Sequence, residues 1–129
     1  MALILIIDDE APIRAILSFQ IKKNGHTVLE AQNGEEGLRL AVTQRPALIF
    51  LDVLMPKIDG WQLCKRLKEE PRTQSVPVVM LTNSVNQIDE LHGWEAGVDE
   101  YLTKPWDPRK LHDVINRFCP SAPEGGATR

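Results

Sequence analysis

Five short apolar runs punctuate this chain, and each is followed by a reactive or turn-forming residue. The first run, residues 3–7, leads directly into Asp8, Asp9 and Glu10. Three later runs end in an acid, a hydroxyl and an ammonium, namely Asp52, Thr82 and Lys104. If the runs are parallel strands of one sheet, their carboxyl ends share the edge where open α/β sheets bind ligands. We therefore expect these side chains to form one site.

Helical patterns separate the apolar runs. Pro12 is favoured in the first turn of a helix, and Asn24-Gly25 stops the helix that follows it. The runs predict strands over residues 3–7, 27–29, 48–51, 78–81 and 101–103. The apolar spacing between and after them predicts helices over about residues 12–24, 34–45, 60–69, 85–96 and 108–118. Strands that are apolar throughout are typical of a sheet covered on both faces, so the pattern predicts an α/β fold with a doubly wound, five-stranded parallel sheet rather than a helical bundle.

Length and charge limit what the chain can do. Its 129 residues suit a single domain with its own core. We expect that domain over residues 1–119, followed by a flexible C-terminal tail, residues 120–129, that is too poor in large apolar side chains to fold. The 15 basic and 18 acidic residues give a net charge of −3, which argues against direct nucleic-acid binding.

The cysteines and the N-terminal segment indicate the compartment. Cys64 and Cys119 are too few and too far apart for a disulfide framework or a zinc cluster, so a reducing cytosol is expected. The first apolar run is too short for a membrane span and has no basic flank of the kind that signal peptides carry. These features predict a soluble, cytoplasmic protein with no membrane contact. The histidines, His26, His92 and His112, show no ligand spacing, which favours surface or loop roles for them.

The converging residues indicate phosphoryl chemistry. Acids that share an edge repel one another unless a cation neutralises them, and Asp8, Asp9 and Asp52 offer hard oxygen ligands that suit Mg²⁺, or Mn²⁺, better than zinc. Such a metal can also hold phosphate oxygens, while Lys104 supplies a charge and Thr82 a hydrogen bond to the same group. A carboxylate beside a metal-bound phosphoryl group can act as a nucleophile and become an acyl phosphate. Asp52 is the best candidate for that role because its strand is expected to be central.

Four segments of the chain resemble the receiver domain of two-component response regulators, the CheY-like family. They are residues 8–10, 52–60, 81–82 and 101–105, and the resemblance covers about residues 2–119. Each segment alone is a weak signal, but the four together in this order are highly specific. The resemblance implies the strand order 2-1-3-4-5 of flavodoxin-like folds, with the switch point between the first and third strands.

The resemblance also implies a phosphorelay role. Asp52 would accept a phosphoryl group from a histidine kinase or a phosphotransfer protein. Asp9 would ligate Mg²⁺ together with Asp52, and Asp8 would assist directly or through water. The backbone carbonyl of Leu54 would complete the protein ligands. The domain would then be a signalling module whose only reactions are its own phosphorylation and dephosphorylation.

A switch is implied as well. Lys104 would pair with the phosphoryl oxygens, and Thr82 would move to hydrogen-bond one of them. Tyr101 would then turn inward and change a face built from the fourth helix, fifth strand and fifth helix. Phosphorylation would thus shift the population from one conformation of this face to another. A downstream effector protein would bind this face, with the chain acting as a monomer or as a phosphorylation-dependent dimer. The Lys104-Pro105 bond resembles one that is cis in the family.

Ordinary roles stay open for several of these residues. Asp9 could instead cap the helix that begins near Pro12, and Tyr101 could be plain core. Trp61 and Trp106 could contribute to a partner surface if they are exposed.

Two departures from the family pattern concern turnover. Asn83 follows Thr82 where the family commonly has alanine, which places a larger polar group beside the phosphoryl pocket. Leu54 is apolar where some fast-cycling relatives carry a polar residue that positions water. We therefore expect slow self-dephosphorylation.

Proteins of other classes fit the sequence less well. A metal-dependent phosphatase with Asp52 as nucleophile would need a second acid at Leu54. A flavodoxin-like FMN carrier shares the sheet order, but the acids at residues 8–10 would repel its phosphate. The alternative that remains is a receiver-like constitutive protein-interaction module whose phosphorylation is disused.

Overall fold

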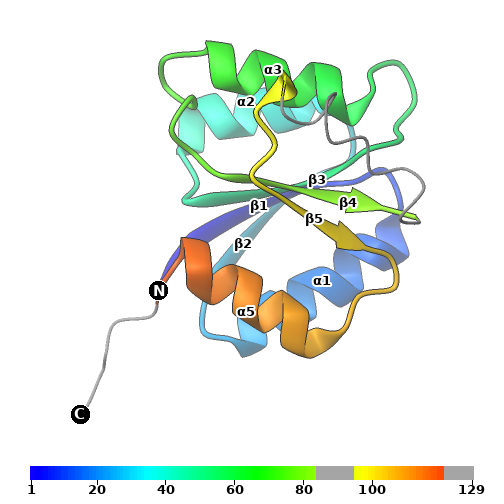
Figure 1. The fold of residues 1–129 in the computed structure, drawn as a ribbon, viewed down its shortest axis with the longest axis vertical. Helices are drawn as coiled ribbons and strands as arrows, with labels where there is room; N and C mark the ends of the chain where they lie inside the picture. Colours follow the sequence, from blue (N-terminus) through cyan, green and yellow to red (C-terminus); the bar gives the residue numbers. More distant parts are fainter. Residues whose placement is uncertain (84–94, 121–129) are drawn as a thin grey trace.

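The computed structural model describes residues 1–83 and 95–120, and it contains the predicted α/β sheet (Figure 1). The strands are β1 (Leu3–Ile7), β2 (Thr27–Ala31), β3 (Leu48–Asp52), β4 (Val78–Thr82) and β5 (Glu100–Thr103). The described helices are α1 (Ala11–Lys23), α2 (Gly34–Gln44), α3 (Gly60–Glu69) and α5 (Pro108–Phe118). All strand pairs are parallel and the order is β2-β1-β3-β4-β5, which confirms the predicted topology.

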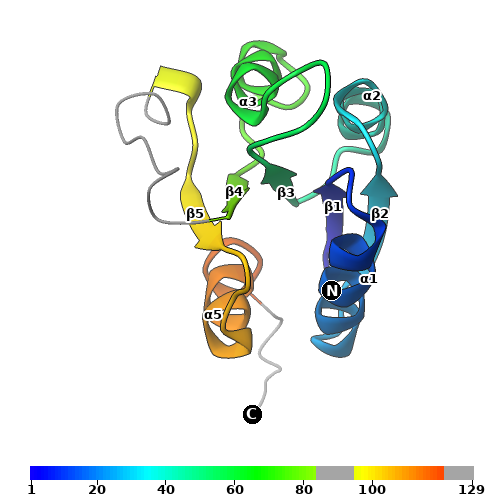
Figure 2. The ribbon, with the colours of Figure 1, turned by 90° about the vertical axis from the view of Figure 1, so that its right-hand side faces the viewer.

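Helices cover both faces of the sheet. Figure 2 shows α2 and α3 on one face and α1 and α5 on the other, with the strands between them. Alternate strand residues therefore enter different cores: Leu5 and Ile7 pack in the cluster under α2 and α3, whereas Ile4 and Ile6 pack in the cluster under α1 and α5. This two-sided burial explains why β1 is apolar at every position.

Some of the expected elements lie wholly or partly outside the described residues. The helix predicted over residues 85–96 is described only at Glu95 and Ala96, which are helical. His92 and Trp94, which fall in that predicted helix, and the tail after residue 120 likewise lie outside the described part of the chain. Within that part, no helix is long and apolar enough to cross a bilayer.

The largest difference between a predicted and an observed strand boundary is at β2. β2 continues through Glu30 and Ala31, two residues beyond the predicted end, and pairs with β1 up to Ile7. The charged Glu30 is accommodated because β2 is an edge strand, where a polar side chain can face solvent. The side chain of Arg14 on α1 pairs with it at 3.3 Å.

The helix starts that border the carboxyl edge are capped in different ways. Asn33 and Asp59 accept backbone N–H bonds from the first turns of α2 and α3, as N-cap residues commonly do. Glu10 occupies the N-cap position of α1 but makes no such bond from its side chain. Its carboxylate is therefore available to the neighbouring strand ends.

Candidate functional site

The predicted strand ends meet at one edge of the sheet. Asp8 follows β1, Asp52 ends β3, Thr82 ends β4 and Lys104 follows β5. The edge is held together through the backbone, where the N–H of Lys104 donates to the Thr82 carbonyl oxygen at 2.6 Å. Asp8 and Thr82 are fully buried and Asp52 is 4% exposed, so these polar groups lie within the protein rather than on a solvated surface.

The Lys104 ammonium is the centre of this cluster. Its Nζ lies 2.9 Å from Asp8 Oδ2, 3.1 Å from Glu10 Oε1 and 3.4 Å from Asp52 Oδ1. The lysine side chain is only 6% exposed, so the pairs with the two buried aspartates are shielded from water. One cation thus faces three carboxylates whose oxygens lie within 4.8 Å of one another.

Burial and charge perturb both Asp52 and Lys104. Burial, reinforced by repulsion from Asp8, raises the pKa of Asp52 to about 7, although the ion pair with Lys104 acts in the opposite direction. Burial alone would lower the pKa of Lys104, but its hydrogen bonds and charge interactions with Asp8 and Asp52 outweigh that effect and raise the pKa. The cluster therefore carries more negative charge than one ammonium can balance, and a further cation would relieve it.

Thr82 contributes a hydroxyl with an unmet hydrogen bond. Its Oγ1 is buried and has no hydrogen-bond partner among residues 1–83 and 95–120. A buried polar atom left unsatisfied costs about 1–3 kcal/mol, so such atoms are rare outside functional sites. Thr82 ends the strand that lies between β3, which ends in Asp52, and β5, which leads to Lys104, so a free hydroxyl there fits a site that receives an oxygen-rich ligand.

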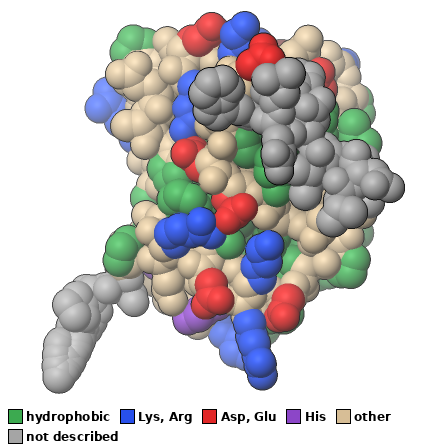
Figure 3. All heavy atoms as spheres, viewed as in Figure 1, with side chains coloured by type: hydrophobic (Ala, Val, Ile, Leu, Met, Phe, Trp, Pro, Cys, Tyr) green, Lys and Arg blue, Asp and Glu red, His purple; other side chains and the backbone are tan. Residues whose placement is uncertain are grey.

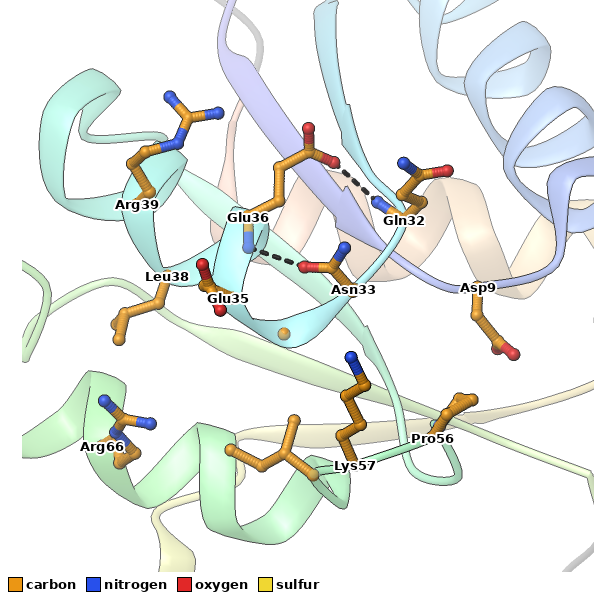
Figure 4. A pocket seen from close by; sticks show the side chains of 12 residues that line it. Asp9, Gln32, Asn33, Glu35, Glu36, Leu38, Arg39, Pro56, Lys57 and Arg66 are labelled. Carbon is orange, nitrogen blue, oxygen red and sulfur yellow. Dashed lines mark hydrogen bonds between the residues drawn. The ribbon is translucent and has the colours of Figure 1, made fainter.

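The three neighbouring acids of the sequence take different positions. Asp8 joins Asp52 as predicted, but the third carboxylate of the group is that of Glu10. The Glu10 N–H donates to Asp8 Oδ1 at 2.8 Å, a short turn that folds the chain back over the site. Asp9 is exposed and is not one of these three carboxylates, and its side chain extends toward the loop that carries Pro56 (Figure 4). The sequence alone does not single out Glu10, although its place directly after two aspartates at a strand end was a usable signal.

Asp9 also borders a cavity of about 610 Å³ next to the site. The cavity lies between the loop after β1, the start of α2 and the loop after β3 (Figure 4). Its charged lining is mixed in sign and consists of Asp9, Glu35, Glu36, Arg39, Lys57 and Arg66. A ligand that bridges Asp9 and the buried acids would sit where this cavity meets the carboxyl edge.

The loop after β3 is shaped by close backbone packing. The N–H of Gly60 donates to the Val53 carbonyl oxygen at 2.7 Å. A Cβ at Gly60 would lie 2.4 Å from the Asp52 carbonyl oxygen, so only glycine fits. Leu54, predicted to offer its carbonyl to a metal, is 52% exposed, and its N–H donates to Asp52 Oδ1 at 3.4 Å.

Tyr101, the predicted switch residue, lies half-buried on β5. Its hydroxyl accepts a hydrogen bond from the Trp61 indole N–H at 3.3 Å, which connects β5 to α3. Trp106 is also half-buried, and its indole N–H donates to Gln20 Oε1 on α1 at 2.6 Å. Both tryptophans thus have part of their surface inside the fold. The Lys104-Pro105 peptide bond is cis, as expected.

The described histidines lie away from the carboxyl edge. His112 is exposed on α5, and its Nδ1 lies 2.9 Å from Asn24 Oδ1. His26 lies in the loop before β2, as predicted, but is 6% exposed and accepts the Ala2 N–H on Nδ1 at 3.0 Å. Its burial was not evident from its lone position in the sequence.

Comparisons with known proteins agree with this geometry. Residues 4–116 match the family model described as the response regulator receiver domain. The chain is 40% identical over 109 residues to the alkaline phosphatase synthesis transcriptional regulatory protein PhoP of Bacillus subtilis, a match that covers 84% of this chain and 45% of PhoP. The chain therefore spans about half the length of that relative.

Solved structures show the same architecture. The chemotaxis response regulator CheY4 of Vibrio cholerae is 30% identical, with a TM-score of 0.85 over 92% of this chain and 98% of CheY4. The receiver domain of sensor histidine kinase PA1611 from Pseudomonas aeruginosa is 25% identical, with a TM-score of 0.83 over 91% of this chain and 96% of that domain. The latter structure has a magnesium ion coordinated in its active site cleft.

Proposed function

The chain belongs to the family of response regulator receiver domains, and from that premise we propose that it accepts a phosphoryl group on Asp52, with Mg²⁺ bound, and thereby switches a protein-interaction face. One observation carries the proposal: the nearly buried carboxylate of Asp52 lies 3.4 Å from the Lys104 ammonium, at the same edge as the unsatisfied hydroxyl of Thr82. A nucleophile, a cation and a free hydrogen-bonding group are what an incoming phosphoryl group requires.

The donor set fits a hard divalent cation. Asp8, Asp9 and Asp52 supply carboxylate oxygens and Leu54 a backbone carbonyl, and these are the residues that would hold Mg²⁺ or Mn²⁺. The excess negative charge around Lys104 favours the same assignment. Burial and repulsion from Asp8 raise the pKa of Asp52, and an added cation would favour its ionised form. When bound, the metal would supply positive charge to the phosphoryl oxygens.

The reaction is a phosphoryl transfer between two protein side chains. An Asp52 carboxylate oxygen bonds to phosphorus, the phosphorus–nitrogen bond of a phosphohistidine donor breaks, and the imidazole leaves with its electron pair and takes a proton from solvent. Lys104 balances the charge of the transferred group, and Thr82 donates its hydroxyl hydrogen to one of the phosphoryl oxygens. Hydrolysis of the acyl phosphate by water reverses the signal. Beyond these two reactions on Asp52 we propose no enzymatic activity.

The signal would be transmitted by contacts with other proteins. Thr82 ends β4, and Tyr101 lies on the neighbouring strand β5, where it pairs with Met80. Movement of the threonine toward a phosphoryl group would then leave space into which Tyr101 turns. We propose a histidine kinase or a phosphotransfer protein as donor and an effector protein as target, in the cytoplasm. PhoP is described as a transcriptional regulatory protein, but nucleic-acid binding by this chain would need another domain or another chain.

The face around β5 and α5 suits a protein partner or a second copy. Figure 3 shows acidic and basic side chains interspersed over this side of the molecule. Arg117 on α5 pairs with Glu100 of β5 at 2.6 Å, so charges of both signs lie near the strand that carries Tyr101. Such a surface can select a partner by matching charges.

The test is intact mass after incubation with Mg²⁺ and acetyl phosphate, comparing the wild type with Asp52→Asn. We expect the wild type alone to gain one phosphoryl group and acetate to be released. Asp113→Asn, an exposed change on α5, should gain the group as the wild type does. If the folded wild type gains no mass with metal present, the alternative holds, and the domain is a constitutive interaction module.

A further inference from the structure

The Glu10 carboxylate does not cap the helix at whose start it lies. It stands at the N-cap of α1 but accepts no hydrogen bond from the first turn of the helix. Its side chain is 55% exposed, and it nevertheless reaches the nearly buried Lys104 ammonium at 3.1 Å. An exposed, flexible acid that extends toward a buried cation instead of capping its helix indicates a contact with a role at the site.

Glu10 differs from the other two partners of Lys104. Asp8 is fully buried at 2.9 Å, and Asp52, the proposed acceptor, is the most distant at 3.4 Å. Glu10 is the one of the three that can swing into solvent without losing packing. It is also the partner on the open side of the cluster, where a phosphoryl donor would have to approach.

We propose that Glu10 is a positioning residue that competes with the phosphoryl group for the Lys104 ammonium. The inference rests on the proposed function of Asp52. In the unphosphorylated state Glu10 holds Lys104 toward the mouth of the site, and a phosphoryl group on Asp52 displaces that carboxylate. Because the ion pair stabilises only the unphosphorylated state, it slows phosphorylation and lowers the phosphorylated fraction at a given donor concentration.

Two variants separate the contact from the charge. Glu10→Gln removes the charge, whereas Glu10→Asp keeps the charge but shortens the side chain by one methylene, so that it no longer reaches Lys104. Asp is a favoured N-cap residue, so this second variant should not weaken α1. Glu69→Gln removes one exposed acid at the far end of α3 and serves as the charge-matched control.

Three measurements are made on each protein. The first is the rate at which Lys104 is acylated by an amine-reactive reagent in the unphosphorylated chain, measured by peptide mass with exposed Lys65 as internal reference. The second is the rate of mass gain with Mg²⁺ and acetyl phosphate. The third is the affinity for Mg²⁺ alone, measured by calorimetry.

We expect both Glu10 variants to increase Lys104 acylation and to speed phosphorylation about two- to fivefold, the range that corresponds to loss of one partly exposed ion pair. Glu69→Gln should match the wild type in all three measurements, and Mg²⁺ affinity should stay within about twofold throughout.

Several results would overturn the inference. Wild-type behaviour of Glu10→Asp would mean that only the charge matters, not the contact. Slower phosphorylation with weaker Mg²⁺ binding in both variants would make Glu10 a metal ligand instead. Unchanged Lys104 acylation would exclude the contact. A wild-type chain that gains no phosphoryl group overturns both proposals, whereas the other outcomes overturn this one and leave the acceptor role of Asp52 intact.

Discussion

The two edges of the sheet use their polar groups in opposite ways. At the amino edge, where the strands begin, Asp99 Oδ2 accepts hydrogen bonds from the Val78 N–H at 2.7 Å and from Lys68 Nζ at 2.9 Å. At this edge one ammonium pairs with one carboxylate, and a backbone N–H donates to the same carboxylate oxygen. At the carboxyl edge a single lysine faces three carboxylates, including the nearly buried Asp52, and a buried hydroxyl lacks a partner among the described residues.

The polar groups of the amino edge stabilise the folded chain, whereas those of the carboxyl edge destabilise it. Satisfied polar groups at the amino edge connect strands and helix and favour the folded chain. Crowded acids at the carboxyl edge disfavour it until a ligand arrives, since bound ligand stabilises the state that binds it. Polar residues of similar type thus have opposite effects on folding, according to whether their partners are already within the chain.

The largest effect we expect is from Gly60→Ala at the carboxyl edge. The added Cβ would lie 2.4 Å from the Asp52 carbonyl oxygen and 2.9 Å from Val53 Cα, both backbone atoms that cannot move independently. The free energy of unfolding in urea should fall by about 3 kcal/mol or more, at the upper end of overpacking costs. Gln62→Ala, exposed in the same turn of α3, should stay within about 0.5 kcal/mol. A small loss at Gly60 would mean that the loop can shift, and that its shape is not set by backbone contact.

The next effect tests the amino edge. Asp99→Ala leaves the Val78 N–H and the Lys68 ammonium without their shared acceptor. We expect the free energy of unfolding to fall by about 2–3 kcal/mol, because a hydrogen bond to a charged group is lost and its partners stay partly buried. The matched control is Asp113→Ala on the exposed face of α5. If the two variants unfold at the same urea concentration, the contacts of Asp99 at the amino edge do not stabilise the fold.

Asp52→Asn should increase the free energy of unfolding, whereas Asp99→Ala decreases it. Burial and the neighbouring Asp8 raise the pKa of Asp52 from 3.8 to about 7, so its protonated form favours folding. That contribution is complete below pH 3.8 and is lost as the pH rises through 7, which leaves the ionised group destabilising above that pH. Without divalent metal, the variant should be more stable than the wild type by roughly 2 kcal/mol at pH 8.

Thermal unfolding in a chelator at pH 8 and pH 4 checks this result. The advantage of Asp52→Asn should be large at pH 8 and nearly absent at pH 4, where the wild-type group is protonated in the folded state. Adding Mg²⁺ at pH 8 should stabilise the wild type more than the variant. If the variant and the wild type are equally stable at both pH values, the ionised acids at this edge do not destabilise the folded chain.

The smallest effect concerns His26 at the amino edge. Burial, with a minor contribution from the N-terminal charge, lowers the pKa of His26 from 6.5. On acidification the unfolded chain therefore takes up the proton first, so the stability contribution is complete above about pH 6.5 and declines as the pH falls through the folded pKa. His26→Asn keeps an acceptor for the Ala2 N–H but does not titrate. Between pH 7 and 5.5, the free energy of unfolding of the wild type should fall by at most about 1 kcal/mol relative to that of His26→Asn. This is the net contribution of one hydrogen bond.

Local pattern predicted most of the architecture. Apolar runs at strand length, proline at the start of α1 and Asn-Gly before α2 indicated the order of elements, because these signals depend on neighbouring residues alone. The family resemblance supplied the strand order, which the structure confirms. β2 was predicted too short because Glu30 looked like the end of a strand, and an edge position tolerates it.

The site was predicted in composition more than in arrangement. Asp8, Asp52, Thr82 and Lys104 meet as expected, because parallel strands bring their carboxyl ends to one edge. The sequence did not reveal that Asp9 is exposed while Glu10 turns back to Lys104, since a single turn decides the direction of each side chain.

Contacts between distant segments account for the rest. The burial of His26 against Ala2, and the Trp61–Tyr101 hydrogen bond across 40 positions of the chain, depend on which elements pack together. The residue types and their spacing along the chain thus established the class of fold and the chemistry of the site. Partners, burial and perturbed pKa values came from the folded arrangement, because each depends on the distance between atoms that are far apart in the sequence.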